Sequence, residues 1–120
     1  MLNLDTHILV FALNGSLTAK ERELLARDHW SISGIVLWEL SKLVELGRIT
    51  LDLHDSDFED AMSRVHVWPI TLDVCRAIAG LDFDSDPADE IIAATSVVEG
   101  VALVTRNKKL RGSKVVPIAG

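Results

Sequence analysis

The stretch Ser85–Glu99, SDPADEIIAATSVVE, decides the fold, because acidic residues run directly into an apolar pattern of helical spacing. Asp86 suits the N-cap of a helix, and Pro87 suits its first position, where the missing N–H would be unpaired anyway. The side chains expected on its buried face are Ile91, Ile92, Thr95 and Val98. We therefore expect a helix that begins at Pro87 and packs one face against a sheet.

Two interpretations of the carboxylates at the start of this helix stay open. Asp86 and Asp89 are three residues apart, as in a capping box with Asp in place of the usual Glu or Gln. Asp89 also lies in the first helical turn, where the positive end of the helix dipole favours an anion. This stretch alone favours capping, and a chemical role requires further acids from elsewhere in the chain.

The rest of the chain alternates between apolar runs of strand length and segments with helical spacing. We expect strands at 2–4, 30–33, 67–70, 101–104 and 114–118, and helices at 6–13, 18–28, 34–46, 52–65, 71–79 and from 87 onward. The run Val101–Val104 is apolar throughout, as is typical of a parallel strand buried on both faces. The pattern predicts one α/β domain over residues 1–120, with three layers and a central, mainly parallel sheet.

Composition restricts the class of protein. With 48% hydrophobic and 25% charged residues, the chain is typical of a globular domain. Its single cysteine, Cys75, cannot form an internal disulfide, and it has neither a signal-peptide pattern nor a long apolar run, so we expect a cytoplasmic protein without a membrane segment. A net charge of −6 argues against affinity for nucleic acid over the whole surface, but a local basic patch beside a metal-loaded acidic pocket remains compatible with it.

Acidic side chains are placed where four elements should meet. Open parallel sheets bind ligands beyond the carboxyl ends of their strands. Asp5 follows the first strand, and Thr105–Asn107 follows the apolar run 101–104. Glu39 lies within two turns of the end of the strand at 30–33, and Asp89 begins the helix before the 101–104 strand. We therefore predict that Asp5, Glu39 and Asp89 share one cleft.

Each of these residues also has a structural alternative. For Asp5 or Thr6, the alternative is that the residue caps the first helix and has no other role. Glu39 can be a solvated helix position, although its apolar neighbours Trp38 and Leu40 argue against that. His7 is expected to be structural.

Cys75 and the three tryptophans, Trp30, Trp38 and Trp68, are expected in the core.

Five of the twelve basic residues fall within nine positions near the C-terminus: Arg106, Lys108, Lys109, Arg111 and Lys114. If this cluster borders the cleft, it can hold phosphates, and binding then weakens as salt rises. The alternative is a solvated loop.

Four segments in register resemble the PIN-domain ribonucleases, specifically VapC-type toxins of toxin–antitoxin pairs. These segments are LDTH at 4–7, SGIVLWELSKLVELGRITL at 33–51, DPADEIIAAT at 86–95 and VALVTRN at 101–107. The resemblance implies a PIN fold, an endoribonuclease that depends on Mg²⁺ or Mn²⁺, a homodimer, and a cognate VapB-like antitoxin that inserts into or covers the site.

By position, the resemblance assigns Asp5, Glu39 and Asp89 as catalytic and metal-binding residues. The resemblance implies that Asp86 supports the metal ligands or caps the helix, and that Thr6 and Thr105 place hydroxyl groups beside the site. The basic residues Arg106, Lys108, Lys109 and Arg111 are the candidates for RNA contact.

The chain departs from the family pattern at Asn107, where many relatives carry a fourth acid. An amide keeps an oxygen ligand but removes one negative charge, so we expect one-metal chemistry rather than two-metal chemistry. The alternative function is a catalytically weak or inactive PIN-fold module that binds RNA or protein. A receiver-like signalling domain is disfavoured, because the first strand ends in one Asp and no Lys directly follows the 101–104 strand.

Overall fold

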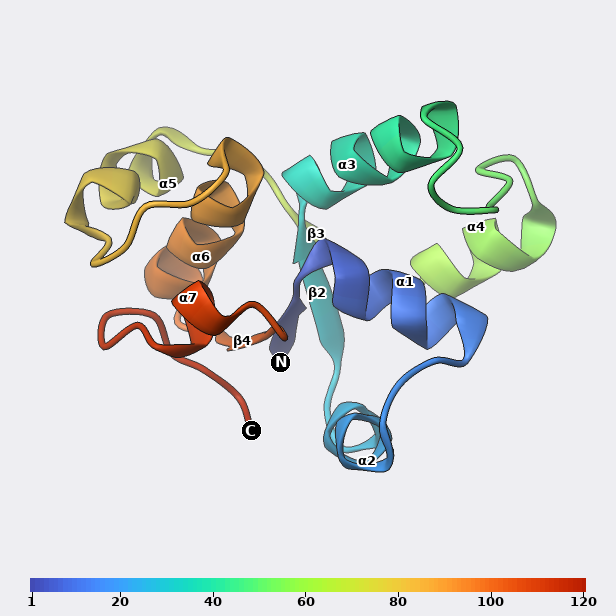
Figure 1. Ribbon diagram of the computed structural model, residues 1–120, viewed down its shortest axis with the longest axis horizontal. Helices are drawn as coiled ribbons and strands as arrows, with labels where there is room; N and C mark the ends of the chain where they lie inside the picture. The colour runs from blue at the N-terminus through green and yellow to red at the C-terminus, as the bar shows by residue number, and fades with distance from the viewer.

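The computed structural model describes all 120 residues and has a central sheet with helices on both sides (Figure 1). Its elements are β1 (Leu2–Leu4), α1 (Thr6–Asn14), α2 (Ala19–Ala26), β2 (Trp30–Ser33), α3 (Gly34–Glu45), α4 (Ser56–Met62), β3 (His66–Trp68), α5 (Leu72–Ala77), the 3₁₀ turn η1 (Ile78–Gly80), α6 (Pro87–Glu99), β4 (Ala102–Val104) and α7 (Lys108–Arg111). Helices α5 and α6 lie on one side of the sheet, and α1 and α4 lie on the other (Figure 1). The predicted three-layer α/β class is confirmed.

The sheet has the strand order β3-β2-β1-β4, and every pair is parallel. In the middle of the sheet, Asn3 of β1 lies between Ser31 of β2 and Leu103 of β4. The first and last strands of the sequence are therefore neighbours, and the carboxyl ends of β1, β2 and β4 open on the same edge. The predicted site residues Asp5, Glu39 and Asp89 lie at this edge.

Helix α6 begins at Pro87 as predicted, but not by the expected capping mechanism. Asp86 occupies the N-cap position, yet its side chain accepts no capping hydrogen bond. The helix ends at Gly100, whose φ of 66° is the left-handed conformation that a glycine adopts without strain. The capping-box interpretation of Asp86 and Asp89 is wrong, and both carboxylates are free for other partners.

The predicted closing strand at 114–118 is wrong. That segment forms one isolated parallel bridge, between Leu103 and Ile118. Pro117 has no N–H to donate, so it contributes only its carbonyl, which accepts from Leu103 N at 2.8 Å. Pro69 limits β3 in the same way, and this strand ends at Trp68 rather than at Ile70.

Side-chain caps explain two differences between the predicted and the observed helices. The helix expected over 52–65 covers only α4, because the Asp55 side chain accepts from Asp57 N and starts the helix there. Helix α7 was not expected at all. It is one turn long, and the Asn107 side chain caps it.

Two residues that were predicted to lie in the core, Trp38 and Cys75, are exposed. Trp38 is 55% exposed and Leu37 beside it is also exposed, so α3 has an open apolar face rather than being largely buried. Cys75 is exposed on α5, because it lies one position past the buried Val74. The longest helix has 13 residues, too short to span a membrane.

Candidate functional site

Asp5 lies at the carboxyl end of β1 and is held on both carboxylate oxygens. Oδ1 accepts from Thr6 N at 2.8 Å, and Oδ2 accepts from the Thr105 hydroxyl at 2.6 Å. The backbone N–H of Asp5 donates to Val104 O at 3.0 Å, which ties it to β4. Asp5 is 6% exposed and also occupies the N-cap of α1. The capping interpretation is therefore right for Asp5 and compatible with a place in the site.

Glu39 projects from α3 toward the same edge and is half-buried. Its Oε1 accepts a hydrogen bond from the Thr6 hydroxyl. Burial raises the pKa of Glu39, the bond from Thr6 opposes this, and the negative charges of Asp5 and Asp89 raise the pKa further. The interpretation of Glu39 as a solvated helix position is wrong.

Asp89 approaches from the first turn of α6 and is also half-buried. Its Oδ2 accepts from the Ser85 hydroxyl at 2.9 Å and from Asn107 Nδ2 at 3.4 Å. Burial raises the pKa of Asp89, the bond from Ser85 lowers it, and the charges of Asp5 and Asp86 raise it. Ser85 was missed from the sequence, where its only signal is its position just before the Asp-Pro pair.

Hydrogen bonds link the three carboxylates. Thr6 donates to both Asp5 and Glu39, and Asn107 donates to Asp89 and to the Thr105 hydroxyl that contacts Asp5. Asp5 raises the pKa of both Glu39 and Asp89, and the charge of His7 lowers both. His7 is exposed in the first turn of α1, so it lies at the rim of the carboxylate group rather than in the core.

Asn107 contacts this group with its amide nitrogen rather than its oxygen. Its Oδ1 accepts from Lys109 N at 2.9 Å and from Leu110 N at 3.5 Å, which caps α7. The Nδ2 group is thereby directed at Asp89. The expectation that Asn107 supplies an oxygen ligand does not match this arrangement, because that oxygen is committed to the helix.

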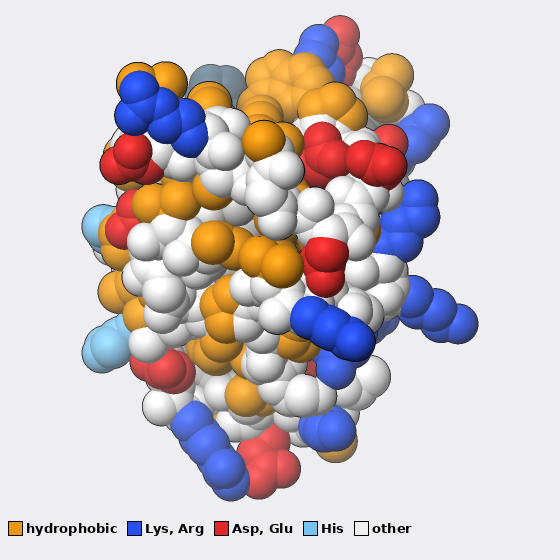
Figure 2. Space-filling model, turned by 90° about the vertical axis from the view of Figure 1, so that its left-hand side faces the viewer, with side chains coloured by type: hydrophobic (Ala, Val, Ile, Leu, Met, Phe, Trp, Pro, Cys, Tyr) orange, Lys and Arg blue, Asp and Glu red, His pale blue; other side chains and the backbone are white.

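An open cleft of about 530 Å³ lies over Asp89 and has no hydrophobic lining. Its walls are formed by Asp84, Ser85, Asp86, Asp89, Asn107, Lys108 and Lys109. Figure 2, which faces the α5 and α6 side, shows acidic side chains bordered by a row of Lys and Arg along its right edge. Lys108 and Lys109 line this cleft together with Asp89, whereas Asp5 and Glu39, which were predicted to share it, are not among its lining residues.

The chemistry of these donors fits a hard divalent cation, since every candidate ligand is a carboxylate oxygen. No three Asp, Glu, His or Cys side chains are already drawn together at metal-binding separation. Asp5, Glu39 and Asp89 each accept a hydrogen bond from a hydroxyl group. Mg²⁺ keeps several waters and needs few protein ligands, so an open group of carboxylates suits it better than a closed cage.

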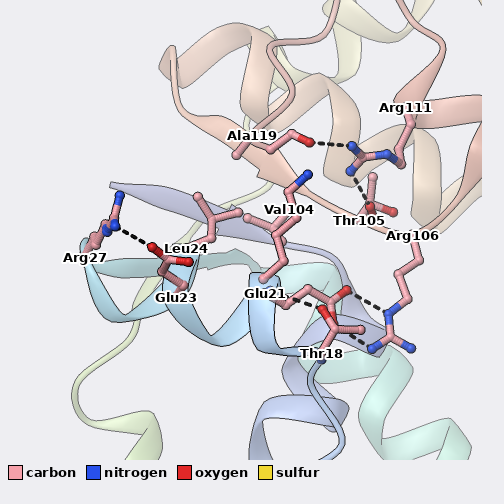
Figure 3. Close-up of a pocket in the computed structure, with 12 residues that line it drawn as sticks. Thr18, Glu21, Glu23, Leu24, Arg27, Val104, Thr105, Arg106, Arg111 and Ala119 are labelled. Carbon is pink, nitrogen blue, oxygen red and sulfur yellow. Dashed lines mark hydrogen bonds and ion pairs between the residues drawn. The ribbon is translucent and has the colours of Figure 1, made fainter.

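Arg106 points toward Glu21 on α2, and Arg111 points toward the C-terminal segment (Figure 3). Arg106 makes two hydrogen bonds to the Glu21 carboxylate, at 2.8 and 2.6 Å, and lies 4.0 Å from the Phe11 ring centre. Arg111 donates to the carbonyls of Thr105 and Gly120. Both line a separate cavity of about 520 Å³ between α2 and the C-terminal segment. Of the four predicted RNA-contacting cations, only Lys108 and Lys109 line the acidic cleft.

The pair formed by Glu21 and Arg106 predicts a measurable pH dependence of stability. The hydrogen bonds from Arg106 hold the pKa of Glu21 at about 2, against an ordinary value of 4.5. A lowered pKa stabilises the fold above the unfolded value, and this stability is lost as pH falls through the folded value. We expect Glu21→Gln to lower the free energy of unfolding by about 1 kcal/mol at pH 7, a figure discounted for solvent screening. The difference from the unmodified chain should disappear between pH 4.5 and about 2.

Urea denaturation at several pH values measures this effect. Glu23→Gln is the matched control, because Glu23 pairs with Arg27 on the same helix, but both side chains are mostly exposed. It should change nothing measurable. Equal effects of both substitutions at all pH values would contradict the assignment.

The PIN domain family model matches residues 3–113 of the chain. Ribonuclease VapC22 of Mycobacterium tuberculosis is 32% identical over 90 residues, which cover 72% of this chain and 69% of that protein. Among solved structures, VapBC2 from Rickettsia felis bound to a DNA fragment from its promoter aligns with a TM-score of 0.73 at 24% identity, covering 99% of this chain and 98% of that one. A toxin–antitoxin complex from Klebsiella pneumoniae aligns with a TM-score of 0.71 at 23% identity, covering 93% and 92%. At these identities the structural matches bear on the fold.

Proposed function

The chain belongs to the PIN-domain family, and we propose that it is a VapC-like toxin, an endoribonuclease that hydrolyses RNA phosphodiester bonds at its acidic cleft. One observation carries the proposal: shared hydrogen-bond donors link the carboxylates of Asp5, Glu39 and Asp89. Of these acids, Asp89 lines a cleft together with Lys108 and Lys109. RNA cleavage in Mg²⁺ or Mn²⁺, with none after chelation by EDTA, tests it.

We propose that Asp5, Asp89 and Glu39 hold one Mg²⁺ or Mn²⁺ ion. A divalent cation bound there supplies a nucleophilic water at neutral pH and neutralises charge on the phosphoryl oxygens. The ion would also relieve the repulsion that raises the pKa of Glu39 and Asp89. Asn107 adds no negative charge, which supports one ion rather than two.

The protein's own groups hold these carboxylates in place. Hydroxyl groups of Thr6, Ser85 and Thr105 each donate to one carboxylate, so each acid is oriented before a ligand arrives. Asp86, which no cap engages, lies on the cleft wall as a further acid. Such orientation by neighbouring donors is typical of functional metal sites.

Lys108 and Lys109 are the proposed phosphate contacts, and this predicts a change in salt dependence. The double substitution Lys108→Gln with Lys109→Gln should weaken binding of a single-stranded RNA. It should also reduce the slope of log K against log salt by about 1.4, since each phosphate contact on a single strand contributes about 0.7. Fluorescence anisotropy with the inactive Asp5→Asn background, between 50 and about 200 mM salt, measures this slope.

The control for this experiment removes two positive charges elsewhere. Arg64 and Arg76 form surface ion pairs on α4 and α5. Arg64→Gln with Arg76→Gln should leave the slope unchanged, and an equal reduction in both double variants would show that only net charge matters.

A cognate antitoxin and a homodimer complete the proposal. Proteins with the same fold have been solved as toxin–antitoxin complexes, which supports a VapB-like partner. The exposed apolar side chains Leu37 and Trp38 next to Glu39 on α3 support a covered face near the site. Light scattering after gel filtration should give twice the 13.2 kDa chain mass, and a monomer at all concentrations would contradict the dimer.

A second candidate function is a PIN-fold binding module with weak or no catalysis. It is favoured by Asn107, whose oxygen caps α7 and is not offered to the cleft. Calorimetric titration with Mn²⁺ separates the two functions. One ion bound at micromolar to millimolar concentration supports the nuclease, whereas no binding in the millimolar range leaves only the module.

A further inference from the structure

We propose that Asn3 is a positioning residue that fixes the distance between Asp5 and Asp89 by tying β1 to α6. This inference rests on the proposed function, because it concerns the same carboxylates. Asn3 contacts neither of them. It acts through the two elements that carry them.

Asn3 joins the strand to the helix through its side-chain amide. Its Nδ2 group donates to Ile92 O at 3.2 Å and to the Ser96 hydroxyl at 2.9 Å. Both Asn3 and Ser96 are 0% exposed. These are the only side-chain hydrogen bonds between β1 and α6, so they define how the two elements are placed along each other.

The tie lies on the faces that carry the carboxylates. Asp5 directly follows β1, and its backbone is still extended, with φ of −64° and ψ of 153°. Because side chains two apart on an extended segment point to the same side, Asn3 and Asp5 both point to the side of the sheet that is turned to α6. Asp89, Ile92 and Ser96 are three and seven residues apart and so share one face of the helix.

The lengths along the two elements also agree. From Asn3 to Asp5 the strand advances by about 6.7 Å. From the level midway between Ile92 and Ser96 back to Asp89, the helix covers about 7.5 Å. The hydrogen bonds of Asn3 therefore place Asp89 at nearly the same level as Asp5 along the direction of the strands.

The amide is not retained for stability alone. Asn3 Oδ1 is buried and has no hydrogen-bond partner, which costs free energy that an apolar side chain would not cost. The two hydrogen bonds from Asn3 Nδ2 align β1 with α6, and this alignment is the gain that stands against that cost.

The test measures Mn²⁺ affinity and stability in parallel on the full chain. We expect Asn3→Leu to remain folded with an unchanged or higher Tm, yet to bind Mn²⁺ about tenfold more weakly by calorimetry without RNA. Ser96→Ala should give a smaller loss in the same direction, and the double variant should lose no more than Asn3→Leu alone. Raising the Mn²⁺ concentration should restore the cleavage rate of Asn3→Leu.

Ser31→Ala is the matched control. Ser31 is also fully buried, and its hydroxyl donates to Leu2 O at 2.8 Å, but it joins β2 to β1 rather than β1 to α6. It should bind Mn²⁺ as the unmodified chain does, whatever its stability. If Asn3→Leu fails to fold, the Mn²⁺ affinity of Ser96→Ala tests the inference, since this variant leaves Asn3 in place.

Two results overturn the inference and are distinguishable from failure of the proposed function. Unchanged Mn²⁺ affinity in both Asn3→Leu and Ser96→Ala refutes the positioning role alone. An equal loss of affinity in Ser31→Ala also refutes it, because the effect would then follow general destabilisation. Absence of Mn²⁺ binding in the unmodified chain refutes the metal site and the positioning role together.

Discussion

Asp5→Asn is expected to reduce RNA cleavage about 10³-fold without unfolding the chain. A bound cation contributes several kcal/mol to transition-state stabilisation, and each 1.36 kcal/mol corresponds to a factor of ten in rate. Loss of one charged ligand removes much of that contribution. The fold should persist, because an asparagine at this position can accept from Thr6 N and donate to the Thr105 hydroxyl, replacing both hydrogen bonds of Asp5.

Single-turnover cleavage of a labelled RNA in Mn²⁺ measures this rate, and circular dichroism establishes that the variant is folded. Asp60→Asn provides the matched control. Asp60 is exposed on α4 and pairs only with Arg64, so its substitution should leave the rate unchanged. Undiminished cleavage by folded Asp5→Asn would refute the nuclease assignment.

Leu4→Ala is expected to have the largest effect on stability, about 3 kcal/mol. Leu4 is 0% exposed in β1, and truncation of a buried leucine loses transfer free energy and leaves a cavity. For a chain of this size, the loss corresponds to a fall in Tm of about 12 °C. Because Leu4 immediately precedes Asp5, the same variant should also bind Mn²⁺ more weakly at temperatures near its new Tm.

Differential scanning calorimetry measures the fall in Tm. Leu72→Ala makes the same chemical change on α5, where the side chain is 63% exposed, and should change the free energy of unfolding by less than about 0.5 kcal/mol. If Leu4→Ala lowered Tm as little as Leu72→Ala does, β1 would not be part of the main core.

Local patterns in the sequence were sufficient for most of the fold. The start of α6 follows from Pro87, whose fixed φ and absent N–H suit the first helical turn. The strands β1 and β4 follow from short apolar runs, and β2 follows from a segment between two helical patterns that is too short for a helix. Asp5, Glu39 and Asp89 could be proposed together because the ends of parallel strands meet at one edge.

The remaining features depend on contacts that no local pattern contains. The role of Arg106 is decided by Glu21, which lies 85 positions away on α2, so a basic cluster in sequence is divided in space. Helix α7 exists because Asn107 uses its oxygen as a cap, and that choice fixes which end of the amide meets Asp89. The tie between Asn3 and Ser96 joins residues 93 positions apart and is visible only once β1 and α6 are placed.

The place of β4 beside β1 has a consequence for the time at which activity arises during synthesis. The first strand made pairs with the last, and the hydroxyl that orients Asp5 comes from Thr105, 100 residues later. A nascent chain that has not yet released β4 exposes one long side of β1 and lacks that hydroxyl. The ribosome must therefore synthesise nearly the whole chain before Asp5 can take up the arrangement described above.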